Sequence, residues 1–166
     1  MKKYLGCLVL LASVSAWSAD SPVTLSVSGL AATLDNGLVK IVFAADASAK
    51  SVTINNDKTN RVENLSGAGR DPDRLRSFYL DYHSLGVTQF KPEALKVIED
   101  SPDRAHIAWE EKNSKLYLEY HMIMEKGERG IYSYVIARNT GDKPRLVSEL
   151  RTIYRFNQSR LNKLYT

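Results

Sequence analysis

The chain has 166 residues, with 23 Lys and Arg against 19 Asp and Glu, a formal net charge of +4 and one cysteine. This length suits one domain with a sizeable core or a piece of a larger protein, and the single cysteine excludes a small scaffold held by disulfides. Basic and acidic residues alternate without a basic block, so we expect no nucleic-acid partner.

The N-terminus has the pattern of a cleavable export signal. Two lysines precede an apolar run over residues 4–16, which is shorter than the about 20 residues of a membrane-spanning helix. We expect residues 1–19 to be the signal, cut between 16 and 19, and residues 20–166 to be the mature domain. Cleavage removes Cys7 and lowers the formal charge to +2, because two lysines are lost. The mature protein is then secreted or periplasmic and has no membrane segment.

The first half of the mature chain predicts a β-meander. Its β-rich runs are Val23–Ser28, Leu38–Phe43 and Lys50–Ile54. Asp35-Asn36-Gly37 is a strong turn signal between the first two runs, and Asn55-Asn56-Asp57 predicts a second turn. Residues 60–72 indicate a long loop or a short helix with loops, and Arg76–Tyr82 indicates an aromatic strand.

The second half predicts a hairpin meander and then a last strand. The four runs are Arg104–Glu110, Lys115–Lys126, Gly130–Asn139 and Glu149–Phe156. Alternation gives the second run an apolar face formed by Leu116, Leu118, Tyr120, Met122 and Met124. Its other face is mixed, with Tyr117, Glu119, His121, Ile123 and Glu125. About ten strands, without a long amphipathic helix, indicate an all-β sandwich.

The last run carries the residues best suited to chemistry. Alternation places Glu149, Arg151, Ile153 and Arg155 on one face. A guanidinium is a planar fork that binds carboxylates in a bidentate way, and Glu149 can hold such a fork in place. The alternative is a solvent-exposed ladder of ion pairs with neighbouring strands, and periodicity alone favours that ladder.

Several segments together resemble the N-terminal domain of polysaccharide lyase family 4, the rhamnogalacturonan (rhamnogalacturonate) lyases. The specific segments are Leu116–Gly127, Gly130–Ile136 and Glu149–Phe156, and looser matches are Leu34–Gly37 and Arg76–Tyr82. The resemblance implies a β-super-sandwich similar to the galactose-mutarotase fold, here incomplete at its C-terminus. It implies cleavage of the rhamnose–galacturonate backbone of rhamnogalacturonan I in pectin by β-elimination. It also places Arg151 at the position of an active-site arginine that binds the uronate carboxylate. Arg155 and Glu149 share its strand face and are the candidate supporting substrate-binding residues, with orienting Arg151 as their alternative role.

The resemblance also sets expectations about what this chain lacks. In the family, the acid/base lysine and histidine follow this strand, so we expect them beyond Thr166 and expect the chain to be an inactive fragment of a lyase. Lys163 is predicted to be a surface residue. The implied partner is a uronate-containing polysaccharide, bound by a monomer without a cofactor. The alternative function is a non-catalytic carbohydrate-binding or vestigial β-sandwich.

The other histidines and aromatic residues are weaker candidates. The three histidines have no spacing that suits a metal site, and we interpret them as isolated and expect no metal: His83, His106 and His121. Strand packing is expected for three aromatic residues, Trp109, Tyr132 and Tyr134. The better candidates for stacking on a sugar ring are Tyr79 and Tyr82, because they lie near the long loop.

Overall fold

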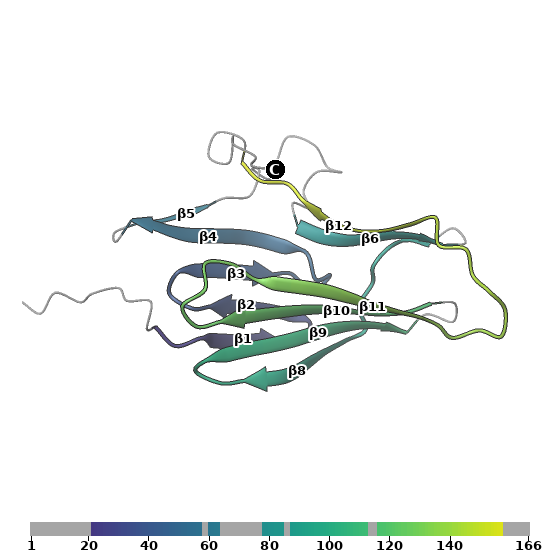
Figure 1. Ribbon diagram of the computed structural model, residues 1–166, viewed down its shortest axis with the longest axis horizontal. Coiled ribbons are helices and arrows are strands. Elements are labelled where there is room, and N and C mark those ends of the chain that lie inside the picture. The colour runs from purple at the N-terminus through teal and green to yellow at the C-terminus, as the bar shows by residue number, and fades with distance from the viewer. Residues whose placement is uncertain (1–20, 58–59, 64–77, 85–86, 113–115, 158–166) are drawn as a thin grey trace, which may run out of the picture.

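The computed structural model describes residues 21–57, 60–63, 78–84, 87–112 and 116–157. Within this part of the chain, twelve strands form three antiparallel sheets, which confirms the predicted all-β sandwich (Figure 1). No helix in the described residues is long and apolar enough to cross a membrane. The predicted export signal and Lys163 lie outside the described residues.

The first sheet contains the three strands of the predicted opening meander and two that were not predicted, β2 and β5, in the order β1-β2-β3-β4-β5. Its members are β1 (Thr24–Ser28), β2 (Ala31–Asp35), β3 (Val39–Phe43), β4 (Ala49–Asp57) and β5 (Asn60–Glu63). The turn predicted at residues 55–57 is wrong, because β4 continues through them and pairs with β5. The loop predicted from residue 60 begins instead as β5, and residues 64–72 lie outside the described part.

The second sheet contains the predicted hairpin meander. Its order is β11-β10-β9-β8, formed by β8 (Ala94–Asp100), β9 (Arg104–Lys112), β10 (Leu116–Glu125) and β11 (Tyr132–Asn139). The third sheet has the order β12-β6-β7, formed by β6 (Phe78–Ser84), β7 (Val87–Gln89) and β12 (Glu149–Tyr154). In this sheet the last strand of the chain therefore pairs with the aromatic strand β6.

The core lies where the apolar faces of all three sheets meet. The predicted apolar face of β10 is confirmed, since Leu118, Met122 and their neighbours on that face are buried. Phe43 of β3 joins the sheets directly, because its ring centroid lies 5.0 Å from that of Trp109 in β9 and 5.9 Å from that of Phe78 in β6. Such tilted aromatic contacts stabilise a core beyond the area that they bury.

The side chain of Asn36 ties the first sheet to the second. Its Nδ2 donates to the carbonyl oxygens of Glu125 and Glu128 at 2.8 and 2.7 Å. Its Oδ1 accepts from the backbone N–H groups of Leu38 and Val39 at 3.1 and 2.8 Å. Asn36 is fully buried, and these four bonds use both donors and both acceptor positions of its amide. The β2–β3 turn is thereby fixed to the β10–β11 hairpin.

Replacing Asn36 should therefore destabilise the whole chain. We expect Asn36→Ala to lower the free energy of unfolding by about 2–4 kcal/mol, because buried carbonyl and N–H groups lose their partners. Asn36→Asp should also destabilise, since it keeps the acceptor and loses the two donated bonds. Urea denaturation measures both effects.

Asn139 provides a matched control for this prediction. It makes the same kinds of bonds at an exposed turn, donating to the carbonyl of Lys143 and accepting from the N–H of Gly141. Asn139→Ala should change the free energy of unfolding by about 0.5 kcal/mol or less. Equal losses for the alanine variants at the two positions would contradict the structural role given to Asn36.

Candidate functional site

Pairing between β12 and β6 builds the arginine cluster, which consists of Arg151, Asp81, Glu149 and Arg155. Arg151 lies directly opposite Asp81 in the antiparallel register. Its Nη2 donates to Asp81 Oδ2 at 2.9 Å, and its Nη1 forms an ion pair with Glu149. The structure therefore brings together the two residues predicted at the start of β12 and adds a carboxylate from β6.

The arginine cluster lies on the solvent side of its sheet. The opposite side of β6 packs into the core through Phe78, Leu80 and Tyr82, which are all buried. Because side chains alternate along a strand, Asp81 and its partner Arg151 must face outwards. The Arg151 side chain is 51% exposed. It can therefore be reached from solvent.

Arg155 lies just after β12, since the strand ends at Tyr154 rather than at the predicted Phe156. Its guanidinium carbon sits 5.4 Å from the ring centroid of Tyr79, which belongs to the outward face of β6. A cation at this distance from an aromatic ring is attracted to the ring face. Tyr79, a predicted sugar-stacking residue, thus has Arg155 over its ring.

The second predicted stacking residue, Tyr82, is wrong. It is buried, and its hydroxyl donates to Glu111 Oε1 at 2.8 Å. Its ring belongs to the core face of β6, so it cannot meet a sugar at the surface. His83, two residues beyond Asp81, is exposed, and its Nδ1 lies 2.6 Å from Ser148 Oγ.

The charges of the arginine cluster are balanced. The hydrogen bond to Asp81 raises the pKa of Arg151, and the nearby Glu149 carboxylate acts in the same direction. With Arg155, the cluster has two cations and two carboxylates. Its contacts are those of the predicted ion-pair ladder. They occupy only part of the five N–H donors of the Arg151 guanidinium, so further donors remain for a ligand.

The outer face of the β8–β11 sheet holds a second group of polar side chains, which the sequence did not predict. His106 and His121 were predicted to be isolated, but the structure contradicts this: His106 Nε2 lies 2.9 Å from His121 Nδ1. The register of β9 and β10 places them diagonally on one face. The ring of Tyr134 stacks on His121 with centroids 4.2 Å apart and planes 9° apart. The Tyr134 ring thus covers one side of His121.

Two carboxylates continue this network along the same face. The hydroxyl of Tyr117 contacts both Glu110 and Glu119, and Glu119 also lies 3.3 Å from His121 Nε2. Burial alone would raise the pKa of Glu110, but hydrogen bonds from Lys96 and Tyr117 hold it below its ordinary value. The pKa of Glu119 is lowered chiefly by its hydrogen bond with Tyr117. Both groups are therefore carboxylates at neutral pH.

The predicted packing of the three strand aromatics is confirmed only for Trp109. It is fully buried, and its Nε1 donates to the carbonyl of Leu30 at 2.7 Å. Tyr132 and Tyr134 are exposed instead, because they fall on the outward face of the edge strand β11. The mixed face of β10 was the available signal for this network, but the cross-strand partners were needed to recognise it.

Within the described residues, no group of three or more His, Cys, Asp or Glu is arranged to hold a metal ion. No family model matches the chain. A rhamnogalacturonate lyase from Dickeya dadantii (strain 3937) is 51% identical to it over 159 residues. The match covers 95% of this chain and 27% of that relative, so the chain spans about a quarter of the relative's length. This similarity confirms the resemblance found from the sequence.

His106 should make stability depend on pH. Burial lowers the pKa of His106, and the nearby His121 and Arg104 lower it further. Glu99 acts in the opposite direction, but its effect is smaller. An unfolded chain then takes up a proton near pH 6.5 before the folded chain does. We therefore expect the free energy of unfolding to fall as the pH drops below about 6.5. The slope should be less than about 1.4 kcal/mol per pH unit, which is the value for a difference of one bound proton between the two states.

Replacement of His106 tests this dependence. His106→Asn should flatten the stability profile between about pH 6.5 and pH 5, whereas acid loss at lower pH, where Glu110 and Glu119 are protonated, should persist. His83→Asn is the control, because His83 is exposed on the other sheet. Urea denaturation across this pH range gives the profiles. Identical profiles for the unchanged chain and His106→Asn would contradict the prediction.

Proposed function

This chain is a homologue of rhamnogalacturonate lyase, and we propose that it acts in pectin degradation as part of such a lyase. The reaction proposed is β-elimination at the rhamnose–galacturonate backbone of rhamnogalacturonan I. The 51% identity carries this proposal, and the exposed arginine cluster on β12 supports it. The proposed setting is outside the cytoplasm, because residues 1–19 have the pattern of an export signal.

The chemistry of β-elimination explains the need for an arginine. A base removes the hydrogen on C5 of galacturonate, next to a carboxylate whose negative charge opposes the developing carbanion. A cation at that carboxylate stabilises the charge, and an acid assists the departure of the oxygen on C4. A guanidinium remains cationic at any pH at which the enzyme works, so it suits the first of these tasks.

In this proposal Arg151 binds the uronate carboxylate. Asp81 and Glu149 hold its guanidinium from two sides, so its direction is set before a ligand arrives. Arg155 lies on the same side of the sheet, over Tyr79, and adds positive charge. Asp81 and Glu149 are positioning residues, and they also keep the cluster neutral without a ligand. A bound uronate uses the donors of Arg151 that these two carboxylates leave open.

The base and the acid are proposed to come from parts of the enzyme outside these 166 residues. Two of the three histidines support this, because His106 and His121 face the outer side of the β8–β11 sheet, while Arg151 faces outwards from the β6–β12 sheet. His83 shares the face of Arg151, where it lies opposite Glu149 and its Nδ1 is 2.6 Å from Ser148 Oγ. A second candidate is carbohydrate binding without catalysis. It is favoured by the ion pairs that already occupy Arg151.

Binding of rhamnogalacturonan oligosaccharides by the 166-residue chain tests the role of Arg151. We expect Arg151→Ala to weaken binding by about tenfold or more, because a hydrogen bond to a charged group contributes about 1.5–3 kcal/mol. Arg151→Lys should be intermediate, because lysine keeps the charge and loses the planar fork. Isothermal titration calorimetry measures the affinities.

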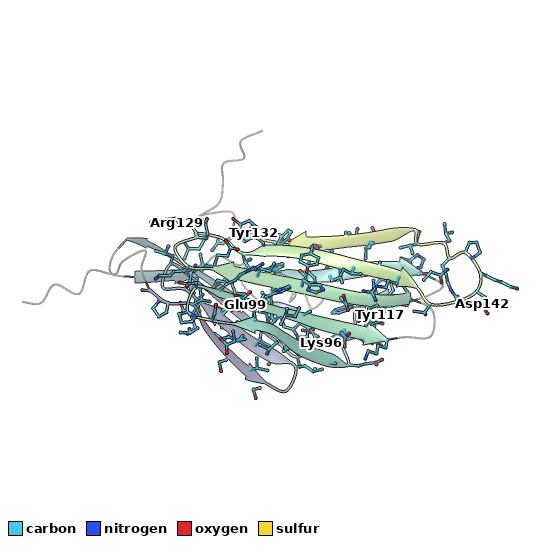
Figure 2. The ribbon with its side chains drawn as sticks, turned by 60° about the horizontal axis from the view of Figure 1, so that its bottom comes forward. Lys96, Glu99, Tyr117, Arg129, Tyr132 and Asp142 are labelled. Atoms are coloured by element: carbon cyan, nitrogen blue, oxygen red, sulfur yellow. The ribbon has the colours of Figure 1, made fainter. Side chains whose placement is uncertain are left out.

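Arg129→Ala is the control for this experiment. Arg129 is an exposed arginine in the β10–β11 turn, and its loss changes the net charge by the same amount (Figure 2). It should leave the affinity within about twofold of the original value, since a distant surface charge is screened by salt. Equal affinity of Arg151→Ala and the unchanged chain would remove Arg151 from the binding site.

Catalysis by the chain alone can be tested separately. Unsaturated uronates absorb in the ultraviolet, so product release from rhamnogalacturonan is followed directly. We expect no increase in absorbance with the 166-residue chain, because the base and acid are assigned elsewhere. An increase that depends on protein concentration would show that these groups lie within the chain. It would also exclude the binding function without catalysis.

A further inference from the structure

Tyr134 presents one face of its ring to solvent from a fixed position. The other face lies against the buried ring of His121, with planes only 9° apart. The Tyr134 hydroxyl also lies 3.5 Å from His106 Nε2. Tyr134 is 42% exposed, and that area must belong to the face and edge turned away from His121. A ring held flat on a sheet surface loses little entropy when a ligand stacks on it.

At the Arg138 end of this face, the charged side chains expose cations to solvent and keep carboxylates covered. At the other end, Glu99 and Glu125 are partly exposed, and both pair with Arg104. Lys96, Lys112 and Arg138 are each more than half exposed. The carboxylates that they contact are not: the side chain of Glu110 is 2% exposed and that of Glu119 is 13% exposed. A ligand that approaches the part of this face around Arg138 therefore meets positive groups first. In Figure 2, Lys96, Tyr117 and Tyr132 are labelled over the strands of this sheet.

We propose that the outer face of the β8–β11 sheet is a second binding site, for an acidic polysaccharide chain, with a sugar ring stacked on Tyr134 and a uronate carboxylate on Arg138. Tyr134 and Arg138 lie four residues apart on β11, roughly 13 Å along the strand. Stacking and charge pairing therefore engage different units of one chain. The ligand is an oligosaccharide rather than a single sugar. Tyr132, also exposed, extends the site along the same strand face.

Arg138 is placed for this role by its neighbours. Its guanidinium carbon lies 5.2 Å from the ring centroid of Tyr117, and its Nη2 lies 3.8 Å from Glu119 Oε2. These contacts lay the side chain along the sheet, while most of it remains exposed. Its planar fork suits bidentate binding of a carboxylate. The site depends on ring geometry and charge, and it is independent of the lyase proposal for Arg151.

Calorimetric titration of the 166-residue chain with oligogalacturonate tests the proposal. We expect Tyr134→Ala to weaken binding by about tenfold, because the stacking surface is lost. Tyr134→Phe should stay within about twofold, since it keeps the ring and loses only the long contact to His106. Arg138→Ala should also weaken binding. A carboxyl-reduced oligosaccharide of the same length should bind weakly to every form. Unchanged affinity in Tyr134→Ala would overturn the proposal.

Two further measurements distinguish this site from the Arg151 site and from binding by charge alone. The NMR signals of the Tyr134 ring in the unchanged chain should shift when oligogalacturonate is added. This measurement needs no variant, so it remains valid even where Tyr134→Ala is unstable. The same shifts should occur in Arg151→Ala, which affects only the other sheet. Absence of shifts would refute the second site and leave the Arg151 proposal intact. Equal affinity for duplex DNA would also refute it, because charge alone would then account for binding.

Discussion

The buried amide of Asn36 is the contact on which the arrangement of the two larger sheets depends. The β2–β3 turn and the β10–β11 hairpin, which are far apart in the sequence, meet at this side chain. In the described residues, no other side chain joins them with four hydrogen bonds. The aromatic contacts of Phe43 supply attraction between sheets, but apolar packing has little directional preference. The amide supplies the direction, because its donors and acceptors are satisfied in only one relative position of the two turns. The position of the β8–β11 sheet, and so of its outer face, depends on this arrangement.

The sequence predicted the strands with the clearest β-rich composition, but it missed β2 although the burial of β2 alternates. β10 is the clearest case, since every second residue from Leu116 to Met124 is buried and the others are mixed. β8 was not predicted, because Lys96, Val97 and Ile98 are all exposed. A bulge between Val97 and Glu99 also breaks the alternation of buried and exposed side chains along this strand. The polar residues 55–57 looked like a turn. Their strand conformation comes from pairing with β5, a tertiary contact that overrides local preference.

In the candidate sites, only the contacts between residues of the same strand could be predicted from the sequence. Glu149 and Arg151 lie two residues apart, so alternation along β12 placed them together. Asp81 lies 70 residues before Arg151. The contact between them depends on the pairing of β12 with β6, which the sequence alone does not reveal. The same limit applied to His106 and His121, which meet only through the register between β9 and β10. Charge balance and the stacked tyrosine follow from these pairings rather than from any local motif.

The alternation of β11 has a consequence for how such a chain tolerates changes in length. Ser133 turns towards Tyr154 of β12, with 3.0 Å between the hydroxyl oxygens, while Tyr134 turns outwards on to His121. Inserting or deleting one residue within β11 would exchange these directions and turn the exposed ring into the sandwich. The loop between β11 and β12 has no such constraint, because a surface connection absorbs extra residues at small cost. Related chains should therefore vary in length after Asn139 and keep a constant number of residues between Tyr132 and Asn139.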